Sequence, residues 1–378
     1  MNPRVVEVPA SMIRALNAKR NAESIDLGLG EPTLMPDIAP FEAATRWVAE
    51  HGCRYTPNVG DPELRAAIAA HYDFPQLARA ENVCITTGSQ EAVYCAIKTL
   101  LDPARDELLV VEPAFAVYVK IAQVEGIAVR TVSMSAADGF AFDPEKILES
   151  IGPKTRMIVV CSPCNPTGRT ISRDAVTRVA KALGDRPGPP VHVLHDEVYR
   201  EQIYREDAGW FAEVYPQTIS VNSLSKSNSL TGLRLGWVIG PSEVMPEIVK
   251  MHAWTTSCAS TFAQRVALEI FRNGAIAANR NWYRTRRDAV VAVARDAGLT
   301  FIEPDGAFFL AVRVGGDSLR FALELIERKN VIAIPGAIFG DAFEGWLRTS
   351  FVGPPEAIRR GYEQIAASSM VRGGSQQP

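Results

Sequence analysis

The chain has 378 residues, of which 47% are apolar and 22% are charged, and its formal net charge is −3. This length is enough for one large domain with a smaller companion, or for two or three domains. The small net charge gives no reason to expect nucleic acid or an anionic membrane as a partner. No apolar run reaches the ~18 residues that suggest a membrane-spanning helix, and residues 1–14 lack the apolar core of a signal peptide. We therefore expect a cytoplasmic protein.

Short β-rich apolar runs alternate with amphipathic helical patterns between residues 83 and 239. Buried strands joined by helices predict an α/β fold with a mostly parallel, seven-stranded sheet flanked by helices. The gap before the last strand is too short for a helical crossover, which allows an antiparallel strand there. The predicted strands are Val83–Thr86, Glu107–Val111, Ala128–Val132, Met157–Val160, Val191–Leu194, Thr218–Val221 and Leu235–Ile239, and the helices are Gln90–Leu101, Phe115–Glu125, Asp143–Ser150 and Arg173–Leu183.

The pattern changes after residue 265 and predicts a smaller α+β domain. An Arg-rich helical pattern runs from Phe262 to Ala297, with Gly274 as a candidate break. Residues 1–40 contain one predicted helix and a Gly/Pro-rich loop. We expect residues 41–270 to form the large domain, and residues 1–40 and 271–378 the small one. Its other predicted elements are the strands Ala307–Val312 and Val331–Ile334 and the helices Ser318–Lys329 and Pro355–Ser368, followed by a disordered tail at Arg372–Pro378.

Polar clusters follow four of the predicted strands. Ligands of parallel α/β sheets bind beyond the carboxyl ends of the strands, so these clusters are expected at one edge of the sheet. Each cluster alone has an ordinary structural explanation, as a helix start, a turn or a helix cap. Their common position favours a binding site. The clusters are Gly88-Ser89-Gln90, Asn165, Asp196 with Tyr199, and Lys226.

Lys226 lies in the segment Ser223–Arg234, among serine, asparagine and threonine residues. An ammonium group in such surroundings is not typical of core packing, and a surface lysine in a Ser-rich loop is the alternative. Lysine condenses reversibly with aldehydes once its amine has lost a proton. Serine hydroxyls and Arg234 suit a phosphate group. Aldehyde chemistry beside a phosphate site indicates pyridoxal 5'-phosphate (PLP).

Cys161 and Cys164 form a CxxC motif that leads into the turn Asn165-Pro166-Thr167-Gly168. A thioredoxin-like pair would normally begin a helix, and a structural zinc site needs further ligands, whereas the sequence has no other CxxC. We therefore expect these cysteines to line a loop, without a redox or metal-binding function.

Motifs along nearly the whole chain resemble the class I/II aminotransferases of PLP fold type I, the group of aspartate aminotransferase. Their order and spacing both fit this family. The motifs are Gly28-Leu29-Gly30-Glu31-Pro32, Tyr55 to Gly60, Leu64-Arg65, Thr87-Gly88-Ser89-Gln90, Glu112-Pro113-Ala114-Phe115, Asn165-Pro166-Thr167-Gly168, Asp196-Glu197-Val198-Tyr199, Ser223-Leu224-Ser225-Lys226, Arg234-Leu235-Gly236-Trp237, Pro335-Gly336 and Leu347-Arg348-Thr349-Ser350-Phe351.

The resemblance implies a role for each residue around the cofactor ring. Lys226 holds PLP as a Schiff base and later moves the proton, and Arg234 is expected to lower its pKa. Asp196 pairs with the pyridine nitrogen, which keeps the ring able to accept electrons. Tyr199 and Asn165 bond the phenolic oxygen. Phe115 stacks on the ring, although a plain core aromatic is the alternative.

The resemblance also implies how the phosphate and the substrate are held. The Gly88-Ser89-Gln90 turn, Ser223, Ser225 and Arg234 bind the phosphate, and Tyr55 reaches it from a partner subunit of a homodimer. Arg348 anchors the substrate carboxylate through a two-pronged pair, with Gly30 and Asn165 beside it. No metal is expected.

The expected function is a ping-pong exchange of the amino group between an α-amino acid and a 2-oxo acid. Two alternatives remain. A PLP enzyme of the same fold could carry out β-elimination, as in a C–S lyase, or act as a biosynthetic cyclase or oxidase. A PLP-binding regulatory module without catalysis is more remote, because no helix-turn-helix segment is recognised in the sequence.

Overall fold

A computed structural model describes residues 1–368 of the chain. The predicted disordered tail, Arg372–Pro378, lies outside these residues. None of the helices in the described part is long and apolar enough to cross a membrane.

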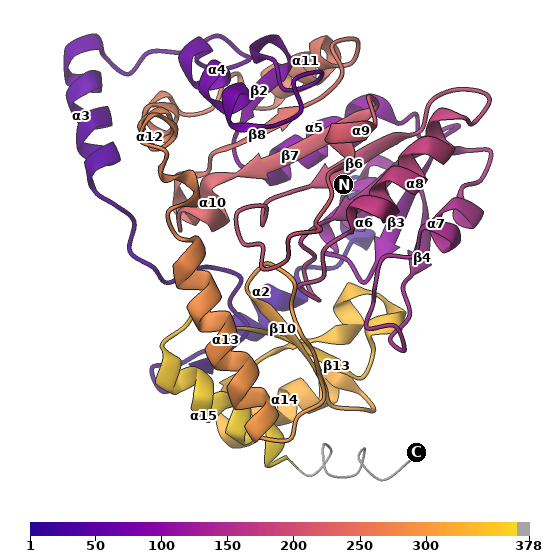
Figure 1. Cartoon of the computed structure of the whole chain (residues 1–378), viewed down its shortest axis with the longest axis vertical. Coiled ribbons are helices and arrows are strands. Elements are labelled where there is room, and N and C mark those ends of the chain that lie inside the picture. The colour runs from indigo at the N-terminus through magenta and orange to yellow at the C-terminus, as the bar shows by residue number, and fades with distance from the viewer. Residues whose placement is uncertain (369–378) are drawn as a thin grey trace.

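A seven-stranded sheet forms the centre of the upper part of the molecule in Figure 1, with the order β2-β8-β7-β6-β5-β3-β4. Its pairs are parallel except that β8 is antiparallel to both β2 and β7. The predicted fold class is confirmed, and so is the orientation of the last strand. The strands are β2 (Val83–Thr86), β3 (Glu107–Glu112), β4 (Ala128–Ser133), β5 (Thr155–Cys161), β6 (His192–Asp196), β7 (Thr218–Ser223) and β8 (Gly236–Ile239).

Helices cover both faces of this sheet because its strands are apolar on both faces. In β5, for example, Met157 and Val159 pack on one face, whereas Ile158 and Val160 pack on the other. Continuous apolar runs of this kind need cover on both sides. One face is covered by α5 (Ser89–Leu100), α6 (Val117–Glu125) and α11 (Met245–Thr256), and the other by α7 (Pro144–Ser150), α8 (Arg173–Gly184) and α9 (Phe211–Val214).

The antiparallel sheet β12-β13-β10-β9 lies below, in the part coloured orange and yellow in Figure 1. The predicted run Val331–Ile334 is divided between two sheets, because β11 pairs with β1 while β12 pairs with β13. The elements of this part are β1 (Ile25–Asp26), β9 (Phe301–Ile302), β10 (Phe309–Arg313), β11 (Val331–Ile332), β12 (Ile334–Pro335), β13 (Trp346–Ser350), α14 (Ser318–Lys329) and α15 (Pro355–Ala366).

The Arg-rich helical pattern is interrupted after Gly274, as expected, and gives α12 (Thr261–Arg272) and α13 (Arg280–Asp296). Helix α13 runs from beside α10 (Leu224–Ser227) at the large sheet towards α14 and α15 (Figure 1). The domain boundaries at residues 41 and 270 stay a prediction. Two further helices, α3 (Ala39–His51) and α4 (Pro62–His71), pack against α12.

One detail of the predicted N-terminal part is wrong. Residues 1–40 contain two short helices before the loop, α1 (Pro3–Glu7) and α2 (Met12–Asn17), where we expected one. Asn2 and Ser11 each cap a helix by accepting a backbone hydrogen bond. Pro9 lies between the two helices, where its ring and missing N–H oppose a continuous helix.

Strand β8 passes very close to the start of α5, and this predicts the effect of a methyl group at Gly236. A Cβ there would lie 2.5 Å from the Ser89 nitrogen and 2.6 Å from the Gly88 carbonyl carbon. Gly236→Ala should therefore lower the free energy of unfolding by about 1–3 kcal/mol. Urea denaturation measures this change. Gly232→Ala is the control, because nothing lies within 4 Å of its Cβ position. Equal transition midpoints for the two variants would contradict the prediction.

Candidate active site

The carboxyl ends of β2, β5, β6 and β7 meet at one edge of the large sheet, because these strands run in the same direction. The four polar clusters predicted from the sequence follow these strands, so they come to one edge as expected. The structure thus brings Ser89, Asn165, Asp196 and Lys226 to a common region.

The start of α5 forms a compact turn with Arg234. Gly88 precedes the helix with φ +81°, a conformation that glycine adopts without strain. A Cβ at Gly88 would lie 2.5 Å from Nη2 of Arg234, so any side chain would fill this space. The first amides of α5, including those of Ser89 and Gln90, have no acceptor within the helix and carry the positive end of its dipole. An anion is favoured at this position.

The one-turn helix α10 presents Lys226 beside this turn. Ser223 caps the helix by accepting a 3.3 Å hydrogen bond from the Ser225 amide. Both serines are buried. Nζ of Lys226 donates a 2.6 Å hydrogen bond to the Gly30 carbonyl oxygen. The N-terminal loop and the segment after β7 therefore meet at this amine.

Burial lowers the pKa of the Lys226 amine to about 8. The neighbouring charges act in both directions, since Glu31 raises this pKa whereas Arg348 and Arg234 lower it. We expected Arg234 to be an important cause, but loss of hydration contributes more. An amine with this pKa is partly unprotonated near neutral pH, which is the form that attacks an aldehyde.

Asp196 ends β6 as a buried carboxyl group, 7% exposed. Burial raises its pKa to about 6, while hydrogen bonds from Tyr118 and the Val198 amide act in the opposite direction. The Tyr118 hydroxyl donates to Oδ2 of Asp196 at 2.6 Å. Burial disfavours the charged form of this carboxyl group, and the positive charge of a protonated ring nitrogen would offset that cost. The group is therefore suited to pair with such a nitrogen.

Tyr118 is a site residue that the sequence analysis missed. It lies in the first turn of α6, three positions after Phe115, which precedes the helix, and the two rings meet edge to face with their centroids 6.4 Å apart. The available signal was this spacing, because residues i and i+3 near a helix start share one face. The tyrosine and Asp196 are 78 positions apart in the chain, so the hydrogen bond itself gave no local signal.

Tyr199 and Asn165 lie near the same centre. The Tyr199 ring is buried edge-on between Phe308 and Phe309 at 5.4 and 5.5 Å. Asn165 is 7% exposed, and its Oδ1 accepts a 3.2 Å hydrogen bond from Nη1 of Arg348. Asn165, which is expected to bond the cofactor, therefore contacts Arg348, which is expected to bind the substrate carboxylate.

Arg348 comes from β13 and is 2% exposed. Its second terminal nitrogen donates to the Gly28 carbonyl, and the guanidinium lies 4.6 Å over the Phe309 ring. Burial lowers its pKa to about 10, so the group keeps its positive charge at neutral pH. A Cβ on Gly30 would lie 3.9 Å from Nη1 of Arg348, and the loop is thus near the guanidinium. A buried fork of this kind suits a carboxylate.

Tyr55 differs from the other predicted residues, since its side chain is 87% exposed. Within residues 1–368, no side-chain hydrogen bond connects it with the site. Its predicted role depends on a second subunit and stays a prediction.

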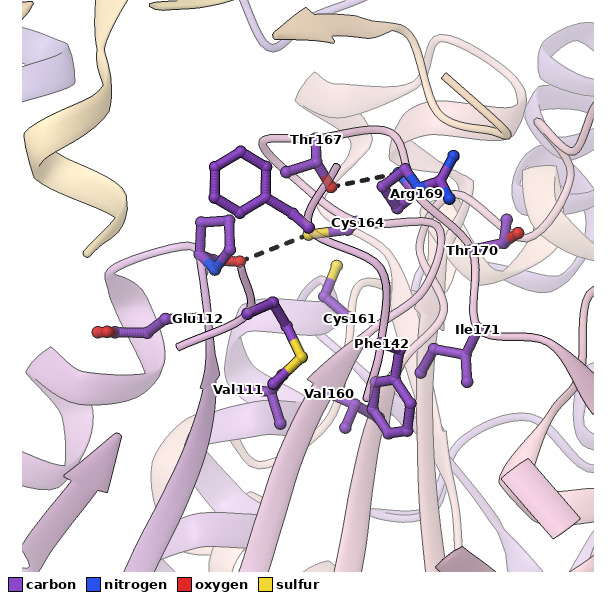
Figure 2. Close-up of a pocket in the computed structure, with 13 residues that line it drawn as sticks. Val111, Glu112, Phe142, Val160, Cys161, Cys164, Thr167, Arg169, Thr170 and Ile171 are labelled. Atoms are coloured by element: carbon purple, nitrogen blue, oxygen red, sulfur yellow. Dashed lines mark hydrogen bonds between the residues drawn. The ribbon is translucent and has the colours of Figure 1, made fainter. Parts of the chain in front are cut away.

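The two CxxC cysteines line a pocket beyond β3 and β5, shown in Figure 2. Sγ of Cys164 donates to the Pro113 carbonyl at 3.5 Å, and Cys161 is the strand neighbour of Asp196. Burial raises the pKa of both thiols, which disfavours the reactive thiolate. This environment agrees with the expected role as lining residues.

The groups at this edge fit PLP. The α5 amides, the serine hydroxyls and Arg234 form a donor set for a phosphate, and the turn at Gly88 leaves no room for a side chain in this cradle. Asp196 is the buried carboxyl group for the ring nitrogen, and Lys226 is the amine for the aldehyde.

Known proteins resemble this chain over nearly its full length. Residues 22–365 match the family "Aminotransferase class I and II". An aspartate aminotransferase of Pyrococcus horikoshii is 34% identical, over 96% of this chain and 95% of that protein. A probable N-acetyl-LL-diaminopimelate aminotransferase of Bacillus subtilis is 32% identical, over 97% and 94%. The solved structure of the Thermus thermophilus aspartate aminotransferase with maleate has a TM-score of 0.90 at 30% identity and covers 97% of this chain and 98% of its own.

The lowered pKa of Lys226 predicts a distinct labelling profile in the cofactor-free protein. The rate of acylation of its amine should rise with a midpoint near pH 8, because burial disfavours the charged form. Lys181 is the internal control, since its hydrogen bond to Asp185 raises its pKa. Mass spectrometry after brief labelling at several pH values measures both residues. A Lys226 midpoint at or above that of Lys181 would contradict the assigned environment.

Proposed function

The chain belongs to the class I and II aminotransferase family, and from this we propose that Lys226, Asp196 and Arg348 are the central residues of its amino-group transfer. It is a PLP-dependent aminotransferase, which acts on an amino acid and a 2-oxo acid. The observation that carries the residue assignment is geometric. Nζ of Lys226 donates to the Gly30 carbonyl at 2.6 Å, the Gly28 carbonyl of the same loop accepts from the buried Arg348, and the buried Asp196 ends the neighbouring strand.

PLP, when bound, supplies an aldehyde that takes up the amino group and a ring that accepts electrons from the substrate. Lys226 would hold it through its amine. Nζ would also be placed to take the proton from the substrate Cα and to return it on the cofactor side. The pKa of about 8 supports this role, because the amine can then both accept and donate a proton near neutral pH.

Asp196 would keep the ring nitrogen protonated, and Tyr118 orients its carboxylate through the 2.6 Å hydrogen bond. Tyr199 and Asn165 would bond the phenolic oxygen, and Phe115 would stack on the ring. The amides of Gly88, Ser89 and Gln90, the hydroxyls of Ser223 and Ser225, and Arg234 hold the phosphate.

Arg348 binds the α-carboxylate that every α-amino acid carries, with Gly30 and Asn165 beside it. Holding this group fixes the Cα–H bond relative to Lys226, which replaces a random encounter by a defined geometry. The same anchor receives the 2-oxo acid in the second half of the ping-pong cycle, because its carboxylate is in the equivalent position.

The working unit is a cytoplasmic homodimer in which Tyr55 reaches the phosphate of the partner's site. Its exposure of 87% in the single chain supports this role, because a tyrosine with an apolar ring and a polar tip is suited to an interface.

The first test is the half-reaction with each of the twenty amino acids and no acceptor. The bound cofactor should change from the pyridoxal to the pyridoxamine form for the true donor, as followed by absorbance. Release of ammonia and pyruvate without a lasting pyridoxamine form would instead establish elimination. Borohydride reduction followed by peptide mapping should place the cofactor on Lys226, and a label on another side chain would overturn the assignment.

Replacement of Arg348 should weaken amino acid binding selectively. Arg348→Gln removes the charge that faces the carboxylate, so KM should rise by about 100-fold or more while the protein still binds PLP. Steady-state kinetics and cofactor titration measure the two effects. Arg359→Gln is the matched control, because Arg359 is an exposed residue that pairs with Glu356 and Glu363. An unchanged KM for Arg348→Gln would show that the carboxylate is held elsewhere.

A further inference from the structure

Helix α10, which carries Lys226, has only four residues. The last carbonyls of a helix have no partner within it, and in a helix of one turn this applies to nearly all of them. The carbonyls of Lys226 and Ser227 find their donors on another element. The Tyr283 hydroxyl donates to the Lys226 carbonyl at 2.5 Å, and Nδ2 of Asn279 donates to the Ser227 carbonyl at 2.9 Å.

Both donors belong to the start of α13, where Asn279 precedes the helix and Tyr283 lies in its first turn. A third hydrogen bond runs in the reverse direction, from Nδ2 of Asn228 to the Ala275 carbonyl at 2.9 Å. Three side chains thus connect the end of α10 with the segment that leads into α13. The backbone of Lys226 is held from outside its own helix.

Tyr283 also contacts the aromatic group behind the site. It is fully buried, and its ring lies nearly parallel to Phe308 at 6.0 Å. Phe308 in turn meets Tyr199 edge to face at 5.4 Å. One side chain therefore fixes the Lys226 carbonyl with its hydroxyl and, through Phe308, supports the Tyr199 ring.

We propose that Tyr283 is a positioning residue for Lys226, which holds the backbone of α10 so that the amine reaches both the cofactor and the substrate Cα. The inference rests on the proposed role of Lys226, and it adds the residue that holds the Lys226 backbone in place. Helix α13 continues to the small sheet and α15 (Figure 1), so these hydrogen bonds connect the Lys226 backbone with that part of the molecule.

The test compares two substitutions that each remove one buried hydroxyl. Tyr283→Phe removes the donor to Lys226, whereas Tyr215→Phe removes a hydroxyl that donates to the Val191 carbonyl at 2.8 Å. Both tyrosines are buried, so their general cost to stability should be alike. In Tyr283→Phe the rate of the half-reaction at saturating amino acid should fall about 10- to 100-fold, because a small displacement of a reacting group has effects of this size. KM should stay near that of the unchanged protein, because Arg348 still holds the substrate.

A second readout does not depend on turnover. The visible circular dichroism of the bound cofactor should decrease in Tyr283→Phe, because its amplitude depends on how rigidly the cofactor is oriented. Hydrogen exchange of the holoenzyme should become faster in the peptide that contains α10. Tyr215→Phe should change neither. If Tyr283→Phe and Tyr215→Phe match in saturating rate and dichroism, Tyr283 only supports the fold and the inference is wrong.

Asn279→Ala provides an independent variant, because it removes the neighbouring donor to Ser227 and leaves the aromatic core intact. It should change the rate and the dichroism in the same direction by a smaller factor, and an unchanged protein would count against the inference. Borohydride mapping on the unchanged enzyme distinguishes a failure of the positioning role of Tyr283 from a failure of the proposed function. A label on Lys226 together with an unaffected Tyr283→Phe refutes only the positioning role. A label on another residue refutes the proposed function and the inference together.

Discussion

Burial of the Lys226 amine is the constraint on which the site depends. An ammonium group loses hydration there, and its pKa falls to about 8. The same loss of hydration raises the pKa of the Asp196 carboxyl group to about 6. The two proton affinities therefore approach each other on either side of neutral pH. Burial at the carboxyl ends of the large sheet is the main cause of both shifts, and the N-terminal loop contacts this region through the Gly30 carbonyl at Lys226 and the Gly28 carbonyl at Arg348 of β13.

The fold was largely predictable because its main strands are continuous apolar runs. All seven strands of the large sheet were predicted, and the short gap before β8 indicated its antiparallel orientation. Two-residue strands such as β1 and β9 escaped prediction, since they contain no period that a sequence pattern could reveal. Four longer elements were not predicted either: α3, α4, α11 and β13. The division of Val331–Ile334 between two sheets also depends on tertiary pairing.

Most residues of the candidate site were predictable from the sequence, whereas the main cause of the Lys226 pKa shift and the hydrogen bond of Tyr118 were not. The sequence placed the polar clusters after the correct strands, because parallel topology brings such positions together. It did not indicate that burial affects the Lys226 pKa more than Arg234 does. Tyr118 was missed because its bond to Asp196 joins distant parts of the chain.

The pairing of β1 with β11 has a consequence for biosynthesis. Ile25 and Asp26 meet Val331 and Ile332, and the carbonyl of Gly28 meets Arg348. All seven strands of the large sheet, in contrast, lie between residues 83 and 239. On the ribosome, that sheet can assemble before the partners of β1 have been translated. The cradle for the phosphate can therefore mature early, whereas the pocket around Arg348 must wait until the nascent chain is almost fully synthesised.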